Sequence, residues 1–161
     1  MERATLILTM LVSAGCGFQK TTPVAHVCAL LSVENAATVA PGLTTATEQP
    51  PRGSADVWTR WCEYTGTGVA ARVSLVVSGA LTSAGAQQLA DDLVHPSDPE
   101  ANVGVVAGLG DKATYTAHWD YGEGLAALRG GYLVGVGKTS GSQAGEAALE
   151  PLVRSVLAQL P

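Results

Sequence analysis

The chain has 161 residues and a formal net charge of -5, and it is 47% hydrophobic but only 14% charged and 5% aromatic. This length predicts one domain with a hydrophobic core, because domains usually span about 100 to 200 residues. Ala, Val, Leu and Gly must fill that core, since aromatic residues are few. The negative charge and the lack of a basic run exclude nucleic acid as an expected partner, because phosphate binding requires Lys and Arg.

The start of the chain predicts export. A short apolar run follows Met-Glu-Arg, and the small residues Ser-Ala-Gly precede Cys16. That layout is typical of an export signal, and the run is too short to cross a bilayer, which takes about 20 residues. We therefore expect a signal peptide at residues 1–15, a tether at 16–23 and a single domain at 24–161. A buried N-terminal helix is the alternative.

Three cysteines leave one unpaired in an exported chain. The count is resolved if Cys16 carries a lipid and Cys28 bonds Cys62. Such a bond would fix the first helix to the first long strand. Two alternatives stay open, namely a plainly secreted domain and a cytosolic protein in which Cys28 and Cys62 are reduced and buried.

The first half of the chain predicts helix followed by a hairpin. We expect a helical turn through Cys28 and a second segment from Val33 to Ala40, with Ser32 as its N-cap. The segment Leu43 to Ala55 is rich in Thr, Pro and Gly and reads as a surface loop. Strands follow over residues 57–64 and 69–78, where apolar and polar residues alternate. In the first strand, alternation places Trp58, Arg60, Cys62 and Tyr64 on one face, and Thr59, Trp61 and Glu63 on the other.

The second half predicts a helix, three strands and a closing helix. A helix capped by Ser83 is expected to run to about Val94, followed by a turn in which Gly108 and Gly110 take positive φ. Strands are expected at 113–119, 125–129 and 132–137, and a final helix at 142–160 that contains Pro151. The expected elements follow the order α-β-β-α-β-β-β-α, which favours an α+β fold class. An antiparallel sheet of about five to six strands flanked by helices, with one disulfide, is what the resemblance described below implies.

Motifs for catalysis, metal or nucleotide are not evident. The histidines at 26, 95 and 118 have no ligand-like spacing with the cysteines, and Asp91 with His95 is explained by the end of a helix. Gly131 to Thr139 resembles a phosphate-binding loop. However, five residues lie between its first glycine and its Gly-Lys-Thr, where the motif requires four. We expect no catalytic residue, no metal, no cofactor and no enzymatic activity.

Aromatic residues concentrate in two expected hairpins. A groove lined by them could bind a small molecule or a protein segment, and the alternative is that they fill gaps that small side chains leave. The candidate groove residues are Trp58, Trp61, Tyr115, Trp119 and Tyr121. An accessory protein that docks a partner through an apolar patch is the second functional class.

Several short motifs support a resemblance. These are the run Cys28-Ala29-Leu30-Leu31, the later Cys62, and Gly108-Leu109-Gly110-Asp111 followed by Ala113 and Tyr115. With the start of the chain, which resembles a bacterial lipoprotein signal, they resemble an uncharacterised lipoprotein family of high-GC Gram-positive bacteria. That family is similar to the extracellular sensor domain of a mycobacterial receptor serine/threonine kinase. The resemblance implies a diacylglyceryl-modified Cys16, a Cys28–Cys62 disulfide, a position on the outer face of the cell membrane, and no established enzymatic activity.

Overall fold

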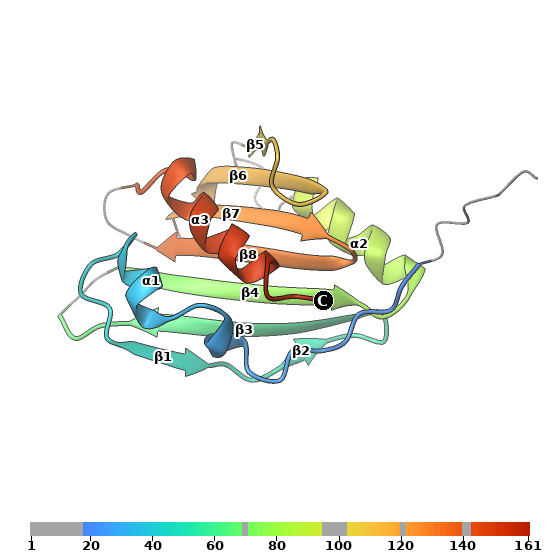
Figure 1. Ribbon diagram of the computed structural model, residues 1–161, viewed down its shortest axis with the longest axis horizontal. Helices are drawn as coiled ribbons and strands as arrows, with labels where there is room; N and C mark the ends of the chain where they lie inside the picture. The colour runs from blue at the N-terminus through green and yellow to red at the C-terminus, as the bar shows by residue number, and fades with distance from the viewer. Residues whose placement is uncertain (1–17, 69–70, 95–102, 120–121, 140–142) are drawn as a thin grey trace, which may run out of the picture.

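One antiparallel sheet organises the part of the chain that the computed structural model describes, namely residues 18–68, 71–94, 103–119, 122–139 and 143–161 (Figure 1). The strands are β1 (Thr45–Glu48), β2 (Arg52–Gly53), β3 (Val57–Thr65), β4 (Arg72–Ala80), β5 (Val103–Val106), β6 (Lys112–Trp119), β7 (Gly122–Arg129) and β8 (Tyr132–Thr139). The helices are the 3-10 turn η1 (Val27–Leu30), α1 (Val33–Ala37), α2 (Ser83–Val94) and α3 (Glu146–Leu157).

The sheet joins two blocks of strands that follow each other in sequence. Its order is β1-β3-β4-β8-β7-β6-β5, and the two-residue β2 also pairs with β3. The pairing of β4 with β8 connects the two blocks over eight residues of each strand, from Arg72 opposite Thr139 to Gly79 opposite Tyr132. The long central strands are therefore β3, β4, β8, β7 and β6, and the short strands lie at the edges.

The main core lies on the face of the sheet that carries η1, α1 and α3, which we call the near face because it faces the viewer in Figure 1. The helix α3 buries an apolar stripe on β7 and β8, while η1 packs on β3 and β4. The disulfide between Cys28 and Cys62 ties η1 to β3, as the sequence predicted. The buried members on β3, β4 and α3 are Trp58, Cys62, Tyr64, Val73, Leu75, Val77, Leu149, Leu152, Val153, Val156 and Leu157.

The opposite face, which we call the far face, carries only α2 among the described helices (Figure 1). A small cluster of Val57, Ala80 and Leu89 forms its core, with Leu128 and Leu133 packed against it. The hydroxyl of Thr114 donates to the carbonyl of Leu93 at 3.0 Å and fixes the C-terminal part of α2 to β6. The far face is thus covered over a smaller area than the near face.

Local signals account for several element boundaries. Ser32 caps α1 by accepting a hydrogen bond from the Asn35 amide, which confirms the predicted cap. The helix α2 ends at Val94 as predicted, but Ser83 is its first residue and not its cap; the hydroxyl of Thr82 accepts from the Gly85 amide at 3.1 Å instead. Gly108 and Gly110 have φ of 75° and 65°, as expected of glycines in a tight turn.

Three short strands correct the expected architecture. The sheet has more strands than the expected five to six, because β1, β2 and β5 were not anticipated. The segment Leu43 to Ala55, expected to be a surface loop, contains both β1 and β2. The backbones of β1 and β2 both pair with the edge of β3. Pro50-Pro51 separates the two strands, because proline has no N–H to donate to the neighbouring strand.

Other boundaries move by a few residues. The second hairpin strand begins at Arg72 and reaches Ala80, and residues 69–70 of the expected strand lie outside the described residues. The strand expected at 125–129 begins earlier, at Gly122. The closing helix begins at Glu146 and continues through Pro151, which is therefore not a first-turn proline.

Two surface properties complete the description. The side chain of Val105 in the edge strand β5 is 79% exposed. No helix in the described ranges has the length and apolar character needed to cross a bilayer.

Candidate functional site

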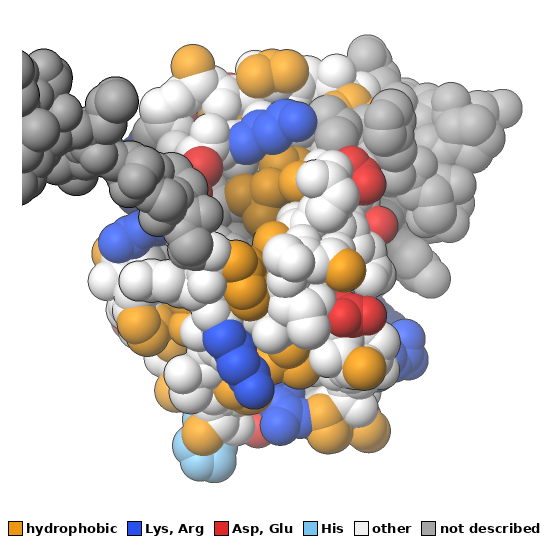
Figure 2. Space-filling view, turned by 90° about the vertical axis from the view of Figure 1, so that its right-hand side faces the viewer, with side chains coloured by type: hydrophobic (Ala, Val, Ile, Leu, Met, Phe, Trp, Pro, Cys, Tyr) orange, Lys and Arg blue, Asp and Glu red, His pale blue; other side chains and the backbone are white. Residues whose placement is uncertain are grey.

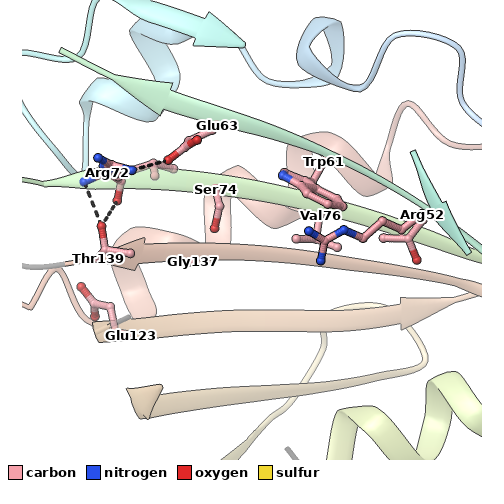
Figure 3. A pocket seen from close by; sticks show the side chains of 11 residues that line it. Arg52, Trp61, Glu63, Arg72, Ser74, Val76, Glu123, Gly137 and Thr139 are labelled. Atoms are coloured by element: carbon pink, nitrogen blue, oxygen red, sulfur yellow. Dashed lines mark hydrogen bonds and ion pairs between the residues drawn. The ribbon is translucent and has the colours of Figure 1, made fainter. Parts of the chain in front are cut away.

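A groove lies over the part of the far face that α2 does not cover. Far-face side chains of β3 and β4, including Trp61, Ser74 and Val76, are only partly buried there. The groove has a volume of about 590 Å³. Figure 3 shows its lining, which consists of Arg52, Thr59, Trp61, Glu63, Arg72, Val73, Ser74, Val76, Glu123, Gly137 and Thr139.

An arginine stacked on a tryptophan forms one side of this groove. The register of β2 against β3 places Arg52 opposite Thr59, two positions from Trp61. The guanidinium carbon of Arg52 lies 4.1 Å from the centre of the Trp61 ring, a cation–π contact (Figure 3). Arg52 makes no salt bridge with any described residue, so the edge of its guanidinium remains available to an acceptor.

The other end of the groove carries an ion pair. Arg72 Nη1 lies 2.9 Å from Glu63 Oε1, and the Arg72 side chain is 62% exposed. The backbone N–H of Arg72 donates to Thr139 Oγ1 at 3.1 Å, which ties the start of β4 to the end of β8. This exposed pair contributes little stability but fixes the position of a second guanidinium at the groove.

The groove therefore combines an apolar floor with Arg52 at one end and the Arg72–Glu63 ion pair at the other. Trp61 and Val76 are register partners and form a continuous apolar surface, while Ser74 lies opposite Gly137 and adds a hydroxyl. A ligand with a flat or aliphatic body and an anionic group matches this arrangement, because the body would cover Trp61 and Val76 and the anion would meet Arg52.

A buried carboxylate lies at the margin of the groove but belongs to the near face. Glu123 is 2% exposed and lies opposite the buried Lys138 in the β7–β8 register. Its carboxylate accepts the amide N–H groups of Ala144 and of Gly145, the latter at 2.8 Å, and the hydroxyl of Tyr115 at 2.9 Å. Glu123 thus holds the two residues that lead into α3, close to the helix N-terminus, where a negative charge is favourable.

This environment raises the pKa of the Tyr115 phenol. Burial, followed by the hydrogen bond and the negative charge of Glu123, raises the pKa of Tyr115 to about 12. The phenol therefore stays protonated at neutral pH and donates to Glu123. The partners of Glu123 are groups that hold α3 and β6 in place, so this buried cluster is explained by structure.

The structure separates the five aromatics proposed for a groove. Trp61 lines the far-face groove, but Trp58 and Tyr115 belong to the near face. Trp58 is buried and packs edge-on against Tyr132, with ring centres 6.0 Å apart. Trp119 ends β6, its side chain is not described, and Tyr121 lies outside the described residues.

Sequence reasoning missed the two arginines of the groove. Arg52 lies in the segment expected to be a loop, so its pairing with β3 was not visible. Alternation correctly placed Glu63 on the same face as Trp61, and the same alternation in the next strand was the available signal for placing Arg72 there. The position of Glu123 had no local signal, because its amide partners are more than 20 residues away in sequence.

Of the predicted cysteine sites, the disulfide is confirmed and the lipid attachment stays a prediction. The Cys28–Cys62 disulfide is present. Cys16 lies outside the described residues, so its acylation remains a prediction. Among the described residues, no three His, Cys, Asp or Glu side chains cluster closely enough to hold a metal ion.

Comparisons of the chain with protein-family models, with curated proteins and with solved structures found no match.

Proposed function

We propose that this protein is a lipid-anchored domain of the cell envelope that acts as a non-catalytic binding or sensing module on the outer face of the membrane. Two observations support an extracytoplasmic position. The apolar run and small residues before Cys16 are typical of an export signal. The Cys28–Cys62 disulfide is of the kind that persists in oxidising compartments.

The far-face groove is the proposed ligand site. The observation that carries this proposal is the Arg52–Trp61 contact, in which a guanidinium without a salt bridge to a described residue lies over the Trp61 ring at the edge of an apolar floor. Holding the guanidinium in advance lowers the entropy that a ligand must overcome on binding. The ligand class that fits is a small amphiphile with a carboxylate or a similar anionic group.

A second candidate function is that of an accessory protein that docks a protein partner. Val105, 79% exposed in the uncharged edge strand β5, favours it. An edge strand without charge, proline or bulge can accept a further strand through its free backbone groups. A plainly secreted domain remains the alternative to lipid anchoring.

The anchoring proposal is tested by intact mass of the membrane-extracted protein before and after reduction. The expected result is a chain that begins at Cys16 with a diacylglycerol and fatty acid attached, and that gains two hydrogens on reduction because one disulfide opens. An unprocessed N-terminus with three alkylatable thiols would contradict both the acylation and the export.

The groove proposal is tested with a set of carboxylates, namely benzoate, indole-3-acetate and octanoate, and with their neutral amides. Binding is followed by NMR shifts of the Trp61 indole and of the amides on β3 and β4. We expect carboxylates to bind more tightly than the amides, and expect Trp61→Ala and Arg52→Gln to weaken that binding.

Arg154→Gln is the matched control, because Arg154 is an exposed arginine on α3 whose charge is remote from the far face. It should leave binding unchanged. Equal affinity for carboxylates and amides, or binding that persists in Trp61→Ala, would place the ligand elsewhere.

A further inference from the structure

The chain that leads from Cys16 into the domain is fixed at one end of the sheet. Thr21 is only 4% exposed. Its backbone N–H and its hydroxyl donate to the carbonyl of Ala80 at 2.9 and 2.8 Å, and its hydroxyl accepts the indole N–H of Trp58 at 2.9 Å. The packed part of the chain therefore begins inside the expected tether of residues 16–23.

The surrounding residues are shaped to receive Thr21. A Cβ at Gly79 would lie 2.3 Å from the Thr21 hydroxyl oxygen and 2.4 Å from the Trp58 ring, so only glycine leaves room for both. The hydroxyl of Tyr132 accepts the amide of the next residue, Thr22, at 3.2 Å. These contacts come from β3, β4 and β8, so Thr21 is joined to the rigid centre of the sheet.

Covalent geometry then limits how far this end can be from Cys16. Thr21 is the fifth residue after Cys16, and even a fully extended chain spans at most about 18 Å over those five steps. The nine residues of β4, from Arg72 to Ala80, extend over about 27 Å. The end of the sheet at Ala80, the Thr21 end, must remain close to the attachment point, whereas the opposite end, the Arg72 end, can stand well away from it.

The groove extends from the Arg72 end past the middle of the sheet, to the position where Arg52 lies opposite Thr59 and Thr59 opposite Ser78. Arg72 begins β4 and Thr139 ends β8, and both line the groove. In contrast, α2 covers the far face near Ala80. Figure 2 views the Thr21 end, on which the basic and acidic side chains of the described residues are scattered without a large patch of either sign.

We infer that the Thr21 end of the domain faces the phospholipid surface, so that the far-face groove opens to the side of the domain with its Arg72 end farthest from the lipid. This inference rests on the proposed acylation of Cys16. The bilayer is engaged because the short connection holds this end beside it, so the orientation does not depend on anionic lipid or on ionic strength. The groove is thereby presented to molecules that arrive from outside the membrane.

The test uses the full acylated chain in phosphatidylcholine nanodiscs that contain a lipid with a spin-labelled headgroup. Paramagnetic relaxation enhancement is measured at amides of the Thr21 end, such as Ser54 and Gly130, and of the Arg72 end, such as Gly66 and Thr139. We expect several-fold larger enhancement at Ser54 and Gly130, unchanged in high salt.

Two variants probe the cause. A long Gly-Ser segment inserted between Gly17 and Phe18 should remove the difference in relaxation enhancement between the two ends. Thr21→Val removes both side-chain hydrogen bonds and should reduce the difference in relaxation enhancement between the ends. Thr22→Val is the control and should leave that difference unchanged, because the Thr22 side chain is exposed and makes no hydrogen bond within the described residues. Unchanged shifts of the Arg72-end amides confirm that each variant is folded.

The outcomes separate this inference from the proposed function. An acylated chain whose two ends show equal enhancement, or whose Arg72 end shows the larger one, overturns the orientation and leaves the anchoring intact. A preference that survives the Gly-Ser insertion also overturns it, because surface contacts would then set the orientation. A chain without lipid in the intact-mass experiment overturns the anchoring proposal itself, and the orientation with it.

Discussion

Glu123 shows how a single side chain can connect two parts of this fold. It extends from β7, accepts amides at the start of α3, and accepts the hydroxyl of Tyr115 on β6. A carboxylate offers acceptor sites on both oxygens, so all these donors can be satisfied at once. The start of α3 therefore depends on a residue that is distant in sequence.

Glu123→Gln should lower the free energy of unfolding by about 1 to 3 kcal/mol. The amide nitrogen cannot accept a hydrogen bond, so at least one of the buried donors loses its partner. The negative charge opposite Lys138 is also lost. Urea unfolding measures the change, and faster amide exchange in the first turn of α3 should accompany it.

Glu150→Gln is the matched control on the same helix. Glu150 pairs with Arg154 at the surface, where the two side chains are 33% and 56% exposed. Its loss should cost no more than about 0.5 kcal/mol. Equal stability of the two variants would mean that α3 begins without help from Glu123.

The raised pKa of Tyr115 makes the folded protein less stable at alkaline pH. Its pKa is about 12 in the folded state and about 10 when unfolded, so the folded state retains the proton longer. The stabilisation is complete below about pH 10 and is lost as the pH rises from about 10 to about 12. Tyr115→Phe should make this fall in stability shallower in urea titrations at successive pH values.

Part of the alkaline loss should remain in that variant, because burial also raises the pKa of Tyr64. Identical pH profiles of the two proteins between about pH 10 and about pH 12 would contradict the role of Tyr115.

Residue-level features were predictable where the cause is local. The Ser32 cap and the positive φ at Gly108 depend on the neighbouring few residues, and the sequence showed both. The position of Glu123, the stack of Arg52 on Trp61 and the burial of Thr21 depend on strand pairing across long separations. Composition and periodicity carry no information on those contacts.

At the level of elements, the disulfide holds a very short helix to the sheet. The turn η1 has four residues and would not be stable alone, since isolated helices of this length are marginal in water. Cys62 is fully buried in the near-face core, so the bond positions η1 over β3. Tyr64 assists by donating to the carbonyl of Leu31 at 2.7 Å.

The double variant Cys28→Ala and Cys62→Ala should be about 3 to 4 kcal/mol less stable, with Tm lower by about 10 °C. The two cysteines are 34 residues apart, and the bond removes the corresponding chain entropy from the unfolded state. Thermal unfolding by circular dichroism measures the loss. Cys16→Ser, which leaves the disulfide intact, should keep the Tm, and a comparable fall in that control would point to another cause.

Long elements with a clear period were predictable, and short edge strands were not. The alternation in β3 and β4 and the helical period in α2 are properties of each segment alone. The strands β1, β2 and β5 are between two and four residues long, and each forms because a longer neighbour offers backbone partners. Such pairing follows from the assembled sheet, so no window of the sequence contains it.

For the whole molecule, the two faces of the sheet are unequal. The near face buries most of the apolar side chains under η1, α1 and α3, while the far face has a small cluster under α2 and a groove beside it. The α+β class followed from the order of helical and alternating segments. The groove did not, because it depends on which half of a face remains uncovered.

The contact of Thr21 with Trp58 and Ala80 also determines where a shortened version of the protein can begin. A soluble fragment that started at Val24 would lose the residue that packs against Trp58 and its hydrogen bonds to Trp58 and Ala80, at a cost of about 1 to 3 kcal/mol. Recombinant production should therefore retain the chain from Phe18 onward, even though those residues resemble a dispensable linker.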